Sequence, residues 1–399
     1  MIWAPVIQPP NARFDGIGTL LMKKSSAGPS TAIWLHGMCS HFDDWAHERA
    51  TVMQKYFGGK VGEPTTIVVP ETGIHIRRYE LITDGHSAYF NFVLWSKPSI
   101  DRKRERLCYD NEFARIGTDE SVRQVCTDPM ESKYFPFPRA ELNGRLKTVL
   151  MNDCLADAVF YAGANGKSLR EAVRKALCIA LSDGDSSNAD CGKPLKLGDI
   201  VLVSESLGSK VLFDSVACSD MATSTKEVAA VNQKQIRSLA AAFSRITHLF
   251  LLANQLPILE LADRAGVCPQ PDLGMVHATE FGGLPNAGLK GFLETIGAAR
   301  QARPRSAQQP HLADQPDLGE RVIVAFTDPN DLLSYRLTDS QVPQDQNIRI
   351  VNIIDSNAGT LLGYVERPDE AHQGYKDNAD TIRLLICGVP AGNQLAFCR

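Results

Sequence analysis

The stretch VLVSESLGSKVLF, residues 201–213, decides the fold class. It begins as a continuous apolar run and ends in a helical pattern, with Ser206 and Gly208 at the joint between them. A continuous apolar run is typical of a strand that is buried on both faces of a parallel sheet. A serine on a tight strand-to-helix turn stands clear of the backbone, and the next N–H groups face the place where negative charge develops on a substrate. The stretch therefore predicts either a reactive serine or an ordinary strand that ends at a capped helix.

Several apolar, β-branched runs alternate with helical patterns along the chain. This order is typical of a mostly parallel sheet with helices on both faces, so the expected fold class is α/β. The clearest predicted strands are residues 31–37, 89–96, 199–206, 247–254, 321–327 and 348–355. Upstream, residues 65–71 and 76–92 predict an antiparallel edge with a turn at Asp84-Gly85.

The length of 399 residues suits one large α/β domain that carries insertions, here a single domain over 1–399. Apolar residues at helical spacing predict helices over 137–162, 168–181 and 209–218. Residues 97–198 then form an insertion and helical region, and 97–137 is a candidate lid. Residues 300–320 are rich in proline and glutamine and predict a flexible loop.

The charge balance argues against a general nucleic-acid binder. The chain has 42 basic and 46 acidic residues, a net charge of -4, whereas phosphate contacts need a basic face. One basic cluster lies at residues 102–106. Acidic residues interrupt it, so it fits a solvated helix or loop face better than a contact with an anionic surface.

The ten cysteines show no CxxC pair and no zinc-like spacing. In a chain of this size they are interpreted as reduced, mostly buried thiols of a cytosolic protein. Residues 1–16 contain no basic region followed by an apolar core, so no signal peptide is expected. No apolar run approaches the ~20 residues that span a bilayer, so no transmembrane segment is expected. The expected location is cytoplasmic, and export without a cleavable signal stays open.

The stretch TAIWLHGMCSHFDDW, residues 31–45, supports the reactive serine. A predicted strand ends in His36-Gly37. In acyl-transfer enzymes of this architecture, the turn after the first core strand supplies a second oxyanion donor. The backbone N–H of Met38 would serve here, beside that of Leu207. His36 is then interpreted as a structural residue under the loop and not as a base.

Neither a metal nor a cofactor is expected. A group of histidines and aspartates follows the His36-Gly37 turn, but its spacing matches no metal-binding motif. Acidic residues at a helix start also stabilise the helix dipole, which explains them without a ligand. The group consists of His41, Asp43, Asp44 and His47.

Two carboxylates follow the strand predicted at 321–327. A carboxylate at this place can orient a histidine and stabilise its imidazolium form. Asp331 lies deeper in the turn and is the first choice. Asp328, directly before Pro329, is more typical of a turn residue and is the second choice.

His372 lies in a polar, glycine-containing loop after the last predicted core strand. A single histidine in such a loop is most often merely exposed. The chain order favours a role here, because Ser206, Asp331 and His372 each follow a buried strand. This is the order expected when three side chains meet above one edge of a parallel sheet.

On these residues the sequence resembles the α/β-hydrolase superfamily, in particular its serine esterases and lipases. The resemblance covers about residues 31–390 and rests on HGM (36–38), SESLG (204–208), TDPND (327–331) and EAHQGY (370–375). It implies an eight-stranded, mostly parallel sheet, a triad of Ser206, His372 and Asp331, and an oxyanion hole built from the N–H groups of Met38 and Leu207. The chain departs from the usual G-x-S-x-G pattern by having a serine at position 204.

The expected function is hydrolysis of a carboxylic ester through an acyl-enzyme. Two alternatives stay open: a non-catalytic scaffold of the same fold that binds a ligand or partner, and an acyltransferase with the same triad. The substrate is expected to be a small-molecule or lipid ester, and peripheral membrane contact stays open. The stretch 251–263 is interpreted as a strand with its core helix, or as an acyl-pocket wall, and its Asn254 and Gln255 fall near the site.

Overall fold

The computed structural model describes residues 3–22, 29–57, 60–83, 86–107, 146–193, 199–218, 226–263, 287–302, 319–359 and 366–390, with a few single residues besides. All six core strands expected from the sequence are present. They lie side by side in the order β11, β10, β9, β8, β3, β7, and all are parallel. Their bounds are β3 Ser30–Leu35, β7 His86–Leu94, β8 Ile200–Glu205, β9 His248–Leu252, β10 Arg321–Thr327 and β11 Ile348–Ile354.

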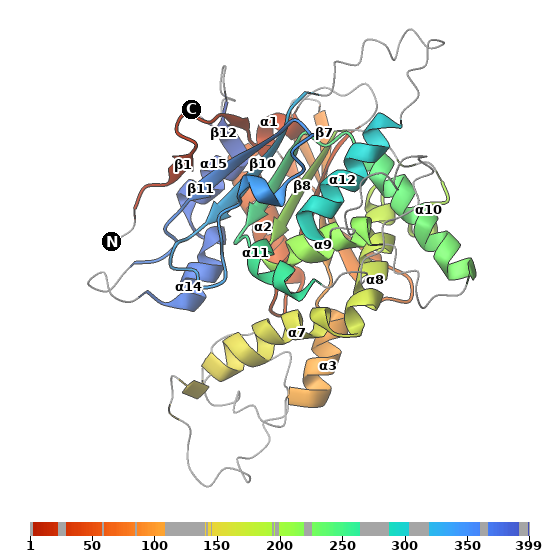
Figure 1. The fold of residues 1–399 in the computed structure, drawn as a ribbon, viewed down its shortest axis with the longest axis horizontal. Helices are drawn as coiled ribbons and strands as arrows, with labels where there is room; N and C mark the ends of the chain where they lie inside the picture. Colours follow the sequence, from red (N-terminus) through yellow and green to blue (C-terminus); the bar gives the residue numbers. More distant parts are fainter. Residues whose placement is uncertain are drawn as a thin grey trace.

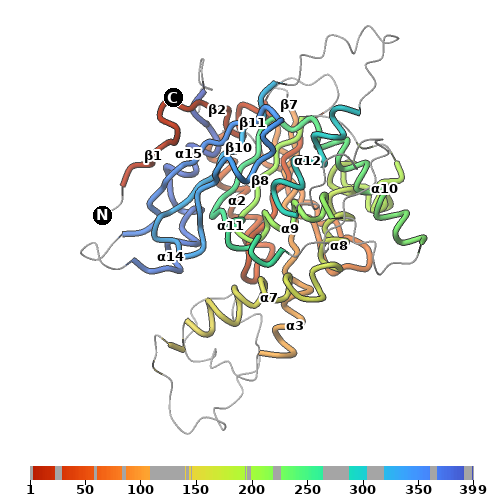
Figure 2. Tube along the Cα trace, in the orientation of Figure 1, coloured from red at the N-terminus to blue at the C-terminus, as the bar shows by residue number. Residues whose placement is uncertain are grey.

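Antiparallel strands complete the sheet at both edges. β6 pairs with β7, as the predicted antiparallel edge requires, and β4 and β5 pair with β6. At the other edge the N-terminal β1 runs antiparallel to β11 (Figure 2). The sheet thus has ten strands within the described residues, not the eight implied by the resemblance. The added strands are β1 Val6–Gln8, β4 Lys60–Val61, β5 Thr65–Val68 and β6 His75–Thr83.

Helices cover both faces of the sheet (Figure 1). One face packs against α8 Asn165–Ala180, α9 Leu207–Ala217, α10 Lys226–Phe243 and α12 Gly288–Gln301. The other face packs against α1 Ile17–Leu21, α2 Asp43–Phe57 and α15 Ala379–Cys387. Side chains alternate between the two cores, so Leu202 of β8 joins the first core while Val201 and Val203 join the second. The short strands β2 Phe14–Asp15 and β12 Gly388–Val389 form a separate antiparallel pair.

In the described part of the region 97–198, the earlier helices project from the body, whereas the later helix α8 packs on the sheet (Figure 1). It contains α3 Lys97–Leu107, the π-helix η2 Leu146–Leu155, α7 Ala156–Ala162, α8 and the short turn η3 Ser186–Asn188. Val159 is one of the apolar residues whose spacing predicts the helix over 137–162, yet this side chain is 73% exposed. Asp153, Cys154 and Asp157 are buried in its place because they contact other elements. Residues 108–137 of the candidate lid lie outside the described residues.

The expectation of reduced thiols is wrong. Among the described residues no cysteine is free. The pairs are Cys39–Cys154, Cys178–Cys191 and Cys387–Cys398, and Cys218 is also disulfide-bonded. The fold brings cysteines 115 residues apart together, which the spacing along the chain cannot show. Disulfides persist in oxidising compartments, so the expectation of a cytoplasmic location loses its basis.

Two predicted loops lie mostly or wholly outside the described residues. Residues 303–318, most of the loop predicted at 300–320, lie outside the described residues, as does the turn Asp84-Gly85. Within the part of the chain that the structure describes, no helix combines the length and apolarity needed to cross a membrane.

Candidate active site

Ser206 occupies a one-residue turn between β8 and α9. Its φ of 52° lies in the left-handed region, which is rare for a residue with a side chain and typical of a strained functional turn. Its N–H donates to the carbonyl of Leu252 at 2.8 Å, which ties the turn to the end of the neighbouring strand β9. The serine is therefore placed at the carboxyl end of the parallel sheet, as the sequence predicted.

Small residues allow this turn to lie against its neighbours. A Cβ on Gly208 would overlap the carbonyl of His36, and a Cβ on Gly37 would lie 2.7 Å from the Cβ of Ser206. Ser204, in place of the usual first glycine, is buried, and its hydroxyl lies 2.9 Å from that of Ser209 in α9. The departure from the pattern thus adds a bond between strand and helix and leaves the turn intact.

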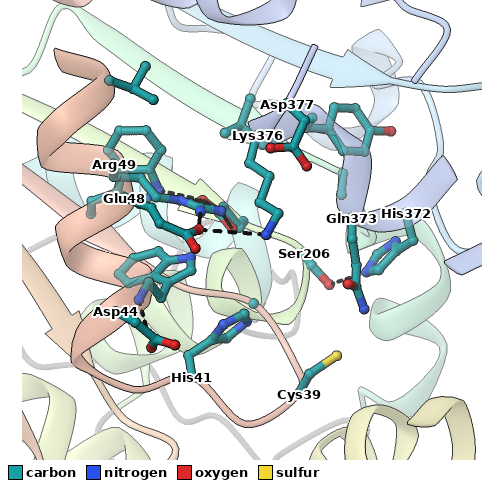
Figure 3. Close-up of a pocket in the computed structure, with 18 of the residues that line it drawn as sticks. Cys39, His41, Asp44, Glu48, Arg49, Ser206, His372, Gln373, Lys376 and Asp377 are labelled. Carbon is teal, nitrogen blue, oxygen red and sulfur yellow. Dashed lines mark hydrogen bonds and ion pairs between the residues drawn. The ribbon is translucent and has the colours of Figure 1, made fainter. Parts of the chain in front are cut away.

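The three predicted triad side chains meet. His372 lies in α14 Pro368–Gln373, and its Nε2 is 3.3 Å from Oγ of Ser206 (Figure 3). Its Nδ1 is 2.9 Å from each carboxylate oxygen of Asp331. With Nδ1–H donating to this carboxylate, Nε2 is left as an acceptor for the serine proton. The arrangement is that of a nucleophile, a base and a group that orients the base.

Asp328, the second choice, does not reach His372. Its carboxylate accepts the N–H of Asn330 at 2.8 Å and the N–H of Asn357 at 2.6 Å, as a turn residue does. Burial raises the pKa of Asp328. Sequence reasoning did not single out Tyr375. Its hydroxyl accepts the backbone N–H of Asp328 at 2.6 Å and lies 3.4 Å from Oδ2 of Asp331, so it links the backbone of Asp328 to the carboxylate of Asp331.

Of the two expected oxyanion donors, Leu207 directly follows Ser206, and Met38 lines the same cavity as Ser206. Leu207 is the first residue of α9, so its N–H has no acceptor within the helix. Met38 lies in the loop after β3, and within the described residues its N–H has no hydrogen-bond acceptor. Both amides are thus available to a ligand at the serine.

His36 is structural, as expected. Its Nε2 accepts the N–H of Trp95 at 2.9 Å, and its Nδ1–H donates to the carbonyl of Gly37 at 2.7 Å. Burial and the neighbouring His41 lower the pKa of His36 well below its usual value, so the ring is neutral. The ring lies under the loop, and its hydrogen bond to Gly37 helps to hold that residue against the serine turn.

Gln255 completes the polar surroundings of His372. Its Nε2 lies 3.4 Å from Nε2 of His372, and its Oε1 is buried without a hydrogen-bond partner in the described part of the chain. Gln255 lies two residues after Ala253. The φ of 50° at Ala253 marks a second strained turn, at the end of β9. The sequence predicted that Gln255 lies near the site but did not predict which residue it contacts.

A cavity of about 650 Å³ opens beside Ser206. Figure 3 shows Ser206 and His372 on one side and His41, Glu48 and Arg49 on the other. Two ion pairs lie on the far wall: Arg49 is 3.3 Å from Glu205, and Lys376 is 3.6 Å from Glu48. Burial lowers the pKa of His41 to about 3, so this wall carries no further cation from that ring.

Among the described residues, His41, Asp43, Asp44 and His47 form no group of closely spaced ligand atoms. Asp43 lies 2.7 Å from His75, Asp44 accepts the N–H of Trp45, and His41 lies 3.1 Å from the carbonyl of Met38. Elsewhere, the ligand atoms of Cys39, Asp153 and Cys154 are close together. The two sulfurs are bonded to each other, so they are not thiolate ligands.

No protein-family model, curated protein or solved structure matches this chain. Function is therefore inferred from the geometry of the site.

Proposed function

We propose that this protein is a serine hydrolase of the α/β-hydrolase type that cleaves a carboxylic ester. The observation that carries the proposal is the relay from Oγ of Ser206 through His372 to Asp331, built on a strained turn at the carboxyl end of a parallel sheet. A structural histidine would not need its Nδ1 on a buried carboxylate and its Nε2 on a serine that lines a cavity.

The mechanism follows from these contacts. Nε2 of His372 takes the proton of Ser206 as Oγ attacks the acyl carbon, and Asp331 stabilises the imidazolium that forms. The oxyanion accepts hydrogen bonds from the N–H groups of Met38 and Leu207. The imidazolium then protonates the leaving alcohol. Water activated by His372 releases the acid from the acyl-enzyme.

Charged and apolar side chains both line the cavity. Arg49, Glu48 and Lys376 form ion pairs on one wall, whereas Trp45, Met53 and Leu385 offer apolar surface, so the lining accommodates either a short or a longer acyl group. Acyl transfer to an acceptor other than water uses the same residues, and the products distinguish it from hydrolysis.

The test is the Ser206→Ala variant assayed with p-nitrophenyl acetate and p-nitrophenyl decanoate. We expect hydrolysis of the short ester by the wild type and a loss of at least about 10³-fold in kcat for the variant. The ratio of the two wild-type rates measures the preference for acyl length. The variant should unfold at the wild-type temperature, because it loses only one hydroxyl.

Ser204→Ala is the matched control, since it removes a buried hydroxyl two residues away. It should keep its activity. Full activity in Ser206→Ala contradicts the proposal. A folded wild type that hydrolyses neither ester favours the alternative of a non-catalytic scaffold.

We also infer from the disulfides that the protein works in an oxidising compartment. Alkylation of the protein from its native source, without prior reduction, should leave these cysteines unmodified. Alkylated Cys39, Cys154, Cys178 and Cys191 would contradict the inference.

A further inference from the structure

The loop that carries Met38 is held from two sides. One side rests on residues just after β7, where the N–H of His41 donates to Oγ of Ser96 at 3.0 Å. The other side is held by η2, which belongs to the region 97–198 and not to the sheet. This contact gives the described part of that region a place in the site.

Two consecutive residues of η2 bind two consecutive residues of the loop. Both carboxylate oxygens of Asp153 accept the N–H of Ser40, at 3.2 and 3.1 Å, and Oδ1 accepts its hydroxyl at 2.5 Å. The next residue, Cys154, forms the disulfide with Cys39. We call Asp153 and the Cys39–Cys154 disulfide the loop clamp.

A buried cation keeps Asp153 in place. Nζ of Lys103 in α3 lies 3.0 Å from Asp153 and 2.7 Å from Asp157, and Lys103 is 4% exposed. Burial lowers the pKa of Lys103, but the charges of Asp157 and Asp153 outweigh this effect and the pKa is raised. The ammonium therefore stays charged and offsets the cost of burying the Asp153 carboxylate. The predicted basic cluster at 102–106 is thus solvated only in part, because Lys103 turns inward.

The loop needs a clamp because its backbone is strained. Cys39 has a φ of 79°, a left-handed conformation that is unfavourable for a residue with a side chain. Relaxation of this φ to a negative value would turn the preceding peptides, including the N–H of Met38, away from their present direction. The bonds on either side of Cys39 oppose that rotation.

We propose that the loop clamp positions the N–H of Met38 as an oxyanion donor, so that Asp153, Cys39 and Cys154 are positioning residues of the reaction. This inference rests on the proposed esterase function. It assigns a positioning role to η2 and α3, in place of the lid role that the sequence suggested for 97–137.

The test compares two disulfide-deleted variants of the full chain, Cys39→Ser/Cys154→Ser and Cys178→Ser/Cys191→Ser. Loss of one oxyanion donor typically costs ~10²–10³ in rate, and a loosened donor costs less. We expect the first variant to lose about 10–100-fold in kcat toward p-nitrophenyl acetate, with KM within about threefold of the wild type. The second variant should keep its kcat although it too becomes less stable, because neither of its cysteines lines the cavity.

Asp153→Asn is a second variant in case the first does not fold. It keeps the size of the side chain but removes the charge that Lys103 pairs with, and we expect a smaller loss in kcat than in the disulfide variant. Unchanged kcat in both Cys39→Ser/Cys154→Ser and Asp153→Asn would overturn the clamp. Equal losses of kcat in the two disulfide variants would also overturn it, because the effect would then be one of stability alone.

Hydrogen exchange separates failure of the clamp from failure of the esterase function. Amides of residues 36–41 should exchange faster in Cys39→Ser/Cys154→Ser than in the wild type or in Cys178→Ser/Cys191→Ser. This measurement needs no substrate, so it decides whether the loop is clamped even if the wild type hydrolyses no ester. Equal exchange in all three proteins would overturn the clamp and leave the proposed function untouched.

Discussion

Asp331 and Asp328 lie three positions apart on one turn, yet they have different partners. Asp331 faces the Nδ1 of His372, whereas Asp328 accepts two backbone N–H groups. The difference reflects distance into the turn. Asp328 directly follows β10, and its carboxylate binds backbone N–H groups near the turn. Asp331 lies three positions later, and its carboxylate reaches His372 in α14.

This difference is testable with two matched substitutions. Asp331→Asn keeps the shape of the side chain but favours the wrong histidine tautomer, which lowers kcat by about 10³–10⁴-fold. Asp328→Asn leaves His372 oriented and should cost stability, roughly 1–3 kcal/mol, with kcat changed less than tenfold. Ester hydrolysis and thermal unfolding of both variants check this. A reversed order of the two kcat values would assign the orienting role to Asp328.

The same residues show how far sequence reasoning extends at this scale. Ser206, Asp331 and His372 could be chosen because each follows a buried strand, and the chain order limits how they meet. Tyr375 and Gln255 could not be assigned, because their contacts depend on side-chain directions within a turn and a short helix. The sequence pattern does not encode those directions.

At the level of elements, strands were predicted better than the helices of the region 97–198. The strand β10 agrees with its predicted bounds because a buried strand is apolar at every position, which leaves little choice of register. The helix expected over 137–162 is present as η2 and α7 over 146–162, but its apolar spacing did not indicate which side chains are buried. Val159 is exposed, whereas Asp153 and Asp157 turn inward to reach Lys103.

The disulfides were missed for a related reason. Periodicity reports which residues share a face of one element, and spacing reports pairs that are close along the chain. Cys39 and Cys154 meet only because η2 packs on the loop after β3. Contacts between distant elements are therefore the part of this fold that the residue pattern alone did not predict.

For the molecule as a whole, a half-buried carboxyl group couples stability to pH. Glu260 follows α11 Leu256–Leu259 and packs against Gly288 at the start of α12. Burial raises the pKa of Glu260 from 4.5 to about 7, although Lys210 opposes the shift. The folded state therefore holds this proton more tightly than the unfolded chain does. Its contribution to stability is present below pH 4.5 and is lost as pH rises through 7.

Glu260→Gln should remove this dependence. The variant should match the wild type near pH 4.5 and exceed it at pH 8 by about 2 kcal/mol in the free energy of unfolding. Urea unfolding across this pH range checks the prediction, with the exposed Glu63→Gln as the control. A wild-type stability that rises relative to Glu260→Gln between pH 5 and 8 would show that Glu260 is not held in its neutral form.

The central claim is that the fold activates Ser206 and no other serine. The most direct measurement is reaction of the intact protein with a fluorophosphonate, followed by digestion and mass spectrometry of the adduct. We predict one adduct, on the peptide that contains Ser206, and its loss in His372→Ala, which keeps the serine but removes its base. A folded wild type that carries no adduct, or carries it on another residue, would contradict the account.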